Sequence, residues 1–163
     1  MKYLKYIYLV CYIFITIIIF AKAVEDGESS SASSNQVTDI VVDTIDTVTP
    51  GEESITDKYD IEDIRYFIRK VIGHFGIFLV LGVFSCLTYY LFLKRKLLSF
   101  IIIILAGFLT AGVSEILQAI PEGRGPSFND VLIDYVGYLI AVVVFSLIFY
   151  LPYYIKRKKV GSS

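Results

Sequence analysis

The chain has 163 residues, of which 56% are hydrophobic and 19% are charged, and its mean hydropathy is +0.68. The apolar share of a single soluble domain is normally nearer ~45–50%, so this composition excludes an ordinary soluble domain and indicates a membrane protein. With 15 Lys and Arg against 16 Asp and Glu, and no basic face on a soluble domain, we expect no nucleic acid partner. Cys11 and Cys86 lie in apolar runs without the spacing of a disulfide framework or zinc site, and we interpret them as packing residues.

Four stretches without formal charge predict four membrane-spanning helices, at residues 6–21, 71–93, 97–114 and 135–155. A helix needs about 20 mostly apolar residues to cross a ~30 Å hydrocarbon core, so the last three qualify directly. The first is shorter, and its flanks (Lys2 and Lys5 before it, Ala21-Lys22-Ala23 after it) also fit a cleaved signal peptide. We favour a retained helix, because the apolar run reaches the upper end of a usual signal-peptide core.

The connecting segments differ in charge. Nine basic residues and no acid occupy residues 2–5, 94–96 and 156–159, whereas residues 22–70 hold twelve acids and five bases. Because basic residues near helix ends stay in the cytoplasm, we expect a multi-pass cell-membrane protein with both termini cytoplasmic. The predicted fold is an all-α, four-helix transmembrane bundle with a first helix (1–23), an acidic, partly disordered exported loop (24–69), a three-helix core (70–155) and a basic tail (156–163).

Within the exported loop, the Ser-rich residues 28–35 predict disorder. Apolar residues recur at helical spacing over residues 37–48 and predict a short amphipathic helix, which Pro50-Gly51 ends. A capping box at residues 54–57 predicts a second helix that runs through Ile61 and Ile68 into the membrane. These helices either only cover the mouth of the bundle or form a lid or a partner surface.

Six polar residues end or begin the last three predicted crossings at one level of the outer leaflet: His74, Glu115, Gln118, Arg124, Asp130 and Asp134. Small residues follow each polar end at helical spacing, and such stripes let membrane helices approach closely. They are Gly82 and Ser85, Gly107 and Ala111, and Gly137 and Ala141. If the stripes pack together, they bring the six polar side chains to one pocket. Because a charge facing lipid costs at least ~2.5–3.5 kcal/mol, we place Glu115 inward.

The six residue types fit several kinds of chemistry. His74, Glu115 and Asp130 are candidate acids and bases, one imidazole with several carboxylates is a set that coordinates divalent metals, and Arg124 suits an anionic headgroup. In a purely structural interpretation these groups only hydrogen-bond between helices. No spacing matches a known hydrolase, metal or phosphate motif, so we assign no metal ligand, cofactor or catalytic residue and leave enzyme activity open. Because six polar groups at one depth exceed what helix adhesion needs, we favour a functional, ligand-binding pocket.

Three segments resemble the VanZ-like family of bacterial membrane proteins, named for a teicoplanin-resistance accessory protein. They read GHFGIFLVLG (73–82), SEILQAIPEGRGPSFNDV (114–131) and DYVGYLIA (134–141), within a resemblance that runs from about residue 54 to residue 148. The family pattern commonly has Asn at the position of Asp134 and Gly at that of Ala141, so this chain carries one additional charge in the pocket. The resemblance implies a multi-pass cell-membrane protein, and in some members lower susceptibility to teicoplanin-type lipoglycopeptides, but no known reaction.

The leading hypothesis is an outward-facing pocket that binds or modifies a component of the cell envelope: a lipid headgroup, a wall precursor or a lipoglycopeptide. Arg124 would hold an anionic group, Glu115 and Asp130 would be the acid/base or ligand pair, and His74 and Gln118 would orient them. Two alternatives stay open. In one, the acidic exported loop recruits a partner and the protein is a non-catalytic scaffold; in the other, the protein is a metal-dependent membrane hydrolase.

Overall fold

The computed structural model describes residues 3–49, 53–93 and 96–160, and these residues form helices without any strand. Four helical segments are long and apolar enough to cross a membrane: Leu4–Ala23, Ile61–Phe92, Leu98–Leu117 and Phe128–Ile148. The predicted all-α fold with four membrane-spanning helices is therefore confirmed. The second segment begins at Ile61, earlier than the charge-free stretch, because Asp60 caps a helix there that buries Ile64 and Ile68.

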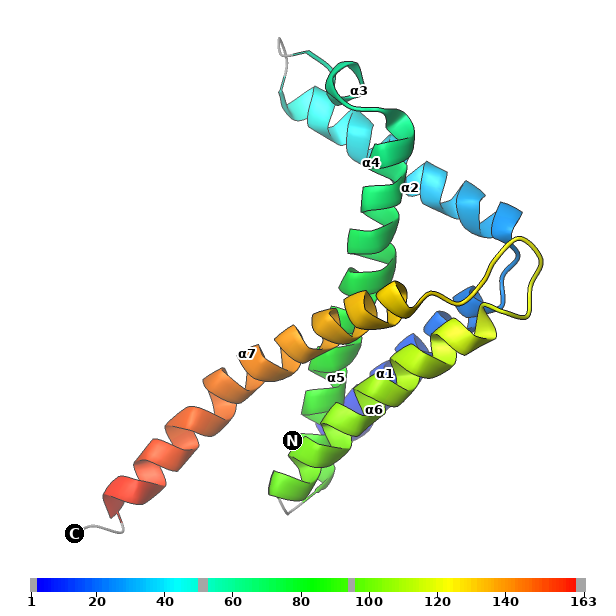
Figure 1. Ribbon diagram of the computed structural model, residues 1–163. Helices are drawn as coiled ribbons and strands as arrows, with labels where there is room; N and C mark the ends of the chain where they lie inside the picture. The colour runs from blue at the N-terminus through cyan, green and yellow to red at the C-terminus, as the bar shows by residue number, and fades with distance from the viewer. Residues whose placement is uncertain (1–2, 50–52, 94–95, 161–163) are drawn as a thin grey trace.

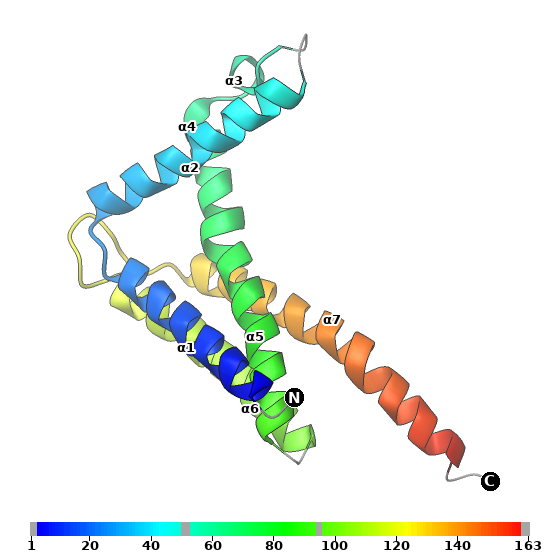
Figure 2. The ribbon, with the colours of Figure 1, turned by 180° about the vertical axis from the view of Figure 1, so that it is seen from behind.

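The central helix is α5 (Ile77–Phe92), which contacts α1 (Leu4–Ala23), α6 (Lys96–Leu117) and α7 (Phe128–Val160). Figures 1 and 2 show α1 and α6 side by side, while α7 crosses α5 and then extends away from the other helices. The start of α1 and the ends of α5 and α7 lie at one end of the molecule, and α2 (Gly27–Val48) lies at the other. This arrangement fits an even number of crossings, and the cytoplasmic assignment of the termini stays a prediction.

The core lies where α5, α6 and α7 meet, around Tyr138, whose side chain is completely buried. The Tyr138 hydroxyl donates to the carbonyl of Ile103 at 2.9 Å and lies 2.5 Å from Ser85 Oγ. Gly82 and Gly107 permit this close approach: a Cβ at Gly82 would lie 2.7 Å from the Tyr138 carbonyl oxygen, and one at Gly107 would overlap the tyrosine ring. The small residues of α5 and α7 therefore meet at Gly82 and Ala141, whereas Gly107 of α6 makes room for the Tyr138 ring.

The prediction of disorder at residues 28–35 is wrong, because these residues form the first half of α2. The Asp26 side chain caps the helix by accepting from Ser29 N at 2.8 Å, and hydrogen bonds from Ser29 lower the pKa of this carboxyl. Helix α2 also packs on α4 (Ile61–Ile68), which supplies tertiary contacts that serine propensity alone does not anticipate.

The predicted second helix of the exported loop is divided in two. Helix α3 (Ile55–Lys58) begins at the Ser54 cap as expected, but it ends after one turn. Asp60 then caps α4 by accepting from Glu62 N at 2.8 Å. The chain is extended at Tyr59 between these two caps, so the helix that enters the membrane starts at Ile61. The predicted break at Pro50-Gly51 lies outside the described residues.

Candidate functional site

The six predicted site residues come together at the end of the bundle that faces α2. His74 lies in η1 (Arg69–Gly76), a π-helical segment between α4 and α5, and π-helical turns are frequent at functional sites. Glu115 lies near the end of α6, and Asp130 and Asp134 lie in the first two turns of α7. Gln118 and Arg124 belong to the connection between α6 and α7. The convergence that the stripes predict is therefore present in the structure.

The His74 imidazole lies at the centre of three carboxyl groups. Its Nδ1 is 3.1 Å from Asp134 Oδ1 and 3.9 Å from Glu115 Oε1, and its Nε2 is 3.9 Å from Asp130 Oδ2. Glu115 is 2% exposed and Asp134 is 1% exposed, so neither carboxyl is in contact with bulk water. We call His74, Glu115, Asp130 and Asp134 the His74 cluster.

Lys70, which the sequence analysis missed, forms an ion pair with Asp130. The lysine is the last charged residue before the charge-free stretch at residue 71, and we counted it only as part of the exported loop. Its position four residues before His74 places the two side chains on one helix face, a signal that was present in the sequence. Because Lys70 and Asp130 are both mostly buried, this pair neutralises one of the three carboxylates of the cluster.

Two neighbouring groups hold the Glu115 carboxylate. Gln118 Nε2 donates to Oε1, and the backbone N–H of Ser127 donates to Oε2 at 2.9 Å. Gln118 is oriented in turn by Arg124, whose Nη2 donates to Gln118 Oε1 at 2.8 Å. Gln118 therefore connects the arginine to the buried carboxylate, rather than facing a ligand with both ends of its amide.

Arg124 fastens the connection between α6 and α7 to the end of α1. Its Nη1 donates to the carbonyl oxygen of Lys22 at 2.7 Å and to that of Glu25 at 3.3 Å. Partial burial lowers the pKa of the Arg124 guanidinium. Most of the Arg124 donors form hydrogen bonds within the protein, so this geometry gives Arg124 a positioning role. Its predicted role of holding an anionic group stays a prediction.

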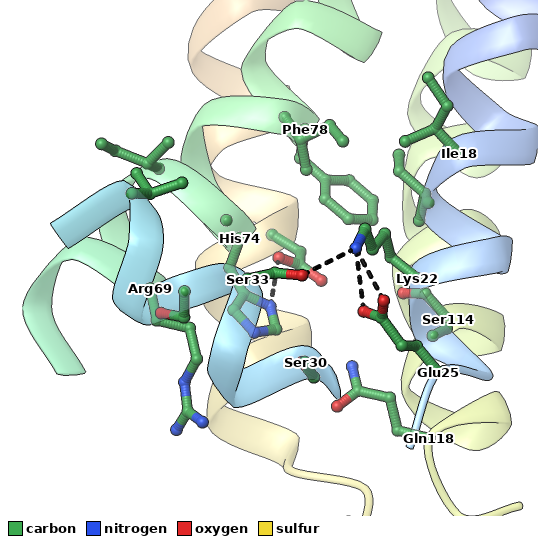
Figure 3. Close-up of a pocket in the computed structure, with 18 of the residues that line it drawn as sticks. Ile18, Lys22, Glu25, Ser30, Ser33, Arg69, His74, Phe78, Ser114 and Gln118 are labelled. Carbon is green, nitrogen blue, oxygen red and sulfur yellow. Dashed lines mark hydrogen bonds and ion pairs between the residues drawn. The ribbon is translucent and has the colours of Figure 1, made fainter. Parts of the chain in front are cut away.

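A cavity of about 310 Å³ lies beside the His74 cluster, between α1, α2 and η1 (Figure 3). His74, Asp134, Ser114 and Gln118 form part of its wall, so the buried cluster faces this space. Ile18 and Phe78 lie on one side of the cavity in Figure 3, and Lys22, Glu25 and Gln118 lie toward the other. The cavity therefore has an apolar part and a polar part.

The cavity wall includes polar residues that the sequence analysis did not propose for the site: Lys22, Arg69, Ser30 and Ser33. Lys22 Nζ lies 2.9 Å from Glu25 Oε1 and 3.4 Å from Ser33 Oγ. Arg69 lies on the opposite side of the cavity from Lys22, and its exposed guanidinium points away from Lys22 (Figure 3) and lies 5.9 Å from the centroid of the Tyr66 ring. Among the residues that the structure describes, Arg69 forms no ion pair. We interpreted the Ser-rich composition of residues 28–35 as a sign of disorder, but Ser30 and Ser33 of this segment line the cavity.

Three side chains of the cluster could hold a metal ion. One ligand atom each from His74, Glu115 and Asp134 lie within 4.8 Å of one another. Without a metal, the same groups form an imidazole between two buried carboxyls, which is suited to moving a proton. The arrangement thus permits acid/base chemistry or coordination, and Asp130 is set apart from both by its pairing with Lys70.

A model of the VanZ/LLP1 family matches residues 6–156. No curated protein and no solved structure shows a significant match to the chain. The family match covers the membrane-spanning helices, apart from the first two residues of α1, and every residue of the His74 cluster. It confirms the resemblance drawn from three segments of the sequence. The chain therefore belongs to the VanZ/LLP1 family, as a multi-pass membrane protein.

Proposed function

We propose that the cavity binds an amphipathic, acidic component of the cell envelope, with the acidic group at Lys22 and Arg69 and the apolar chain beside Ile18 and Phe78. The observation that carries this proposal is the division of a single cavity into a polar and an apolar part. Ligand pockets commonly combine an apolar lining with a few placed polar groups. The ligand class includes phospholipid headgroups, lipid-linked wall precursors and lipoglycopeptides.

The charges around the cavity favour an anion. Lys22, Arg69 and Arg124 all line it, whereas Glu25 is the one acid on its rim among the described lining residues outside the His74 cluster. Glu25 pairs with Lys22, and Arg124 is engaged by backbone carbonyls. The Arg69 guanidinium is exposed and lies over the Tyr66 ring, a contact that leaves its N–H donors available for a ligand. Arginine binds carboxylate and phosphate oxygens in a bidentate manner, which suits both acidic groups.

The size of the cavity limits how much of a ligand it encloses. About 310 Å³ is at the lower end of the ~300–1,000 Å³ range of ligand pockets. A headgroup and the first part of a chain fit this volume, whereas the remainder of a long chain would lie along the bundle. The exposed side chains of Ile72 and Val37 on the cavity wall offer such an apolar path out of the cavity.

The outward orientation is part of the proposal, because it depends on the positive-inside pattern of the sequence. Single cysteines at Asp43 and Glu122, two exposed positions on the cavity side, test it in a background with Cys11 and Cys86 replaced by alanine. We expect both positions to react with an impermeant thiol reagent in intact cells. Labelling only after the cells are opened would place the cavity on the cytoplasmic side and contradict the proposal.

Binding is tested with the purified full-length protein and three probes that join an acidic group to an apolar chain: phosphatidylglycerol, undecaprenyl phosphate and teicoplanin. Phosphatidylcholine of the same chain length is the zwitterionic control lipid. We expect Arg69→Gln to weaken binding of the preferred probe about three- to tenfold, as loss of a partly exposed charge-assisted hydrogen bond would. Lys58→Gln, an exposed lysine in α3 away from the cavity, is the matched control. Equal affinities of wild type and Arg69→Gln for all three probes would overturn the proposal.

A susceptibility assay then tests whether the cavity contributes to protection of cells against teicoplanin. Cells that express wild type are expected to tolerate more teicoplanin than cells without the protein, and cells that express Arg69→Gln or Glu115→Gln are expected to lose this protection. Membrane levels of each variant are measured in parallel. Full protection by both variants at equal levels would remove the cavity from the mechanism.

Recruitment of a partner by α2 is the second candidate function, and its surface offers one specific observation. Ile40 is 60% exposed, and the acids Asp39 and Asp43 are exposed on the same helix. Deleting α2 would also open the cavity, because Ser30, Ser33 and Val37 line it. Ile40→Ser with Asp43→Asn is therefore the sharper test: loss of protection with unchanged probe binding would favour recruitment over binding.

A further inference from the structure

We propose that His74, Glu115 and Asp134 bind one divalent transition-metal ion of the Zn²⁺ or Mn²⁺ type at the wall of the cavity. The inference rests on the proposed function for its biological meaning, since the ion would face the bound headgroup. Its geometric basis is independent of any ligand. Three ligand atoms, from three different helical segments, lie within 4.8 Å of one another.

The separation between the His74 and Asp134 ligand atoms matches a shared ion, and the Glu115 carboxylate lies nearby. Ligand atoms that are each about 2.0–2.2 Å from one metal lie roughly 3–3.6 Å apart at the usual coordination angles. His74 Nδ1 and Asp134 Oδ1 are 3.1 Å apart, which is within this range. Glu115 Oε1 is 3.9 Å from the same nitrogen and all three ligand atoms lie within 4.8 Å of one another, so the Glu115 carboxylate would move toward the bound ion.

The surrounding groups orient these ligands as they do in metal sites. Metal-bound imidazoles usually present their second nitrogen to a carboxylate, and His74 Nε2 lies 3.9 Å from Asp130 Oδ2. Asp130 is itself fixed by its ion pair with Lys70. Gln118 and the backbone N–H of Ser127 hold Glu115 through its two oxygens. Two of the three ligands, His74 and Glu115, thus have neighbouring groups that orient them.

Charge gives a second and independent reason for a cation. Among the residues that the structure describes, neither Glu115 nor Asp134 forms an ion pair with a lysine or an arginine. Both are at most 2% exposed, and an ionised carboxylate at such a position is costly unless it is paired or coordinates a metal. One divalent ion offsets two carboxylates, whereas the single imidazole offsets at most one.

The ligand types point to a transition metal with an open coordination position. One imidazole nitrogen and two carboxylate oxygens suit Zn²⁺ or Mn²⁺, whereas Ca²⁺ takes six to eight oxygens and Cu⁺ prefers sulfur. His74 and Asp134 line the cavity, so the remaining coordination positions would face the space where the headgroup binds. Three protein ligands with one open position are typical of metal sites that bind a substrate or water.

The test is a titration of metal-free, purified full-length protein in detergent with ZnCl₂ alone, repeated with MnCl₂. We expect wild type to bind one ion per chain, and His74→Ala and Asp134→Asn to bind it at least tenfold more weakly. Asp43→Asn, which removes an exposed acid from α2, is the matched control and should bind like wild type. Asp134→Asn keeps the size of the side chain, and a melting curve of each variant verifies that it is folded.

Two results would overturn the proposal: no stoichiometric binding of either ion by folded wild type, or equal affinity of folded Asp134→Asn and wild type. The titration contains no envelope probe, so its failure leaves the proposed cavity function standing. Conversely, Arg69→Gln is expected to retain Zn²⁺ affinity while it loses affinity for the acidic probe. The two proposals therefore fail separately.

Discussion

The polar groups around Tyr138 and those around His74 both lie within the membrane-spanning helices, but their hydrogen bonds and charges are arranged differently. Near Tyr138 the polar groups are neutral: the hydroxyl contacts Ser85 and the Ile103 carbonyl, and glycines let the helices approach. Near His74 there are three carboxyls, one lysine and one imidazole beside a cavity. The first region has the polar groups that helix packing needs, whereas the second has more charge than packing requires.

The largest effect on stability is expected at Tyr138, in the neutral region. Tyr138→Ala removes a completely buried ring and should lower the free energy of unfolding by about 3–5 kcal/mol, as other aromatic-to-alanine changes in cores do. Reversible denaturation in mixed micelles measures it. Val144→Ala, on the exposed face of the same helix, is the control and should have a small effect. A loss below about 1 kcal/mol for Tyr138→Ala would show that this region does not hold the helices together.

Much of the fold follows from simple patterns in the sequence. Charge-free stretches predict four crossings, and the part of the chain that the structure describes has four helices long and apolar enough to cross a membrane. The small residues Gly82 and Gly107 predict close helix contacts, and both pack against Tyr138. The same stripes lead to polar ends, so the meeting of His74, Glu115 and Asp134 is predictable from helical spacing alone.

Other features depend on tertiary contacts or on competing local signals. Lys70 lies at the border between a loop and a crossing, and only the position of Asp130 on another helix shows that it is paired. Serines have modest helix propensity, so α2 depends on its Asp26 cap and its packing on α4. The capping signals at Ser54 and Asp60 lie close together, and which one starts the membrane helix is decided by the burial of Ile64.

A smaller loss of stability is expected at Lys70, in the charged region. Lys70→Met leaves Asp130 without its lysine partner, with the His74 imidazole still 3.9 Å away, and breaking a buried pair costs about 3–5 kcal/mol in soluble proteins. Because the lysine side chain is 14% exposed, we expect about 2–3 kcal/mol in the same denaturation assay. Lys58→Met, an exposed lysine in α3, is the control and should have little effect.

The double variant with Lys70→Met and Asp130→Asn shows whether the pair itself or the unpaired charge matters. If the loss comes from the unpaired carboxylate, the double variant should recover at least half of it. A double variant as unstable as Lys70→Met alone would mean that the lysine contributes mainly through packing, and the contrast between the charged and neutral regions would be weaker.

A small effect on stability, with a large effect on Zn²⁺ binding, is expected at Asp134. Asp134→Asn removes a charge but keeps a side-chain amide that can hydrogen-bond with His74 Nδ1, so the free energy of unfolding should change by less than about 1 kcal/mol. The Zn²⁺ affinity should nevertheless fall at least tenfold, since a metal ligand is lost. Denaturation and titration of the same preparation measure both quantities.

Ser85→Ala supplies the matched change in the neutral region. The Tyr138 hydroxyl keeps its bond to the Ile103 carbonyl, so we expect a loss near the ~0.6 kcal/mol average of membrane interhelical hydrogen bonds. Its Zn²⁺ affinity should equal that of wild type, because Ser85 is not among the proposed ligands. A similar drop in Zn²⁺ affinity for Ser85→Ala and Asp134→Asn would mean that metal binding only reports stability. If Asp134→Asn lowers the Zn²⁺ affinity and Ser85→Ala does not, the Tyr138 region serves helix packing and the His74 cluster serves ligand binding.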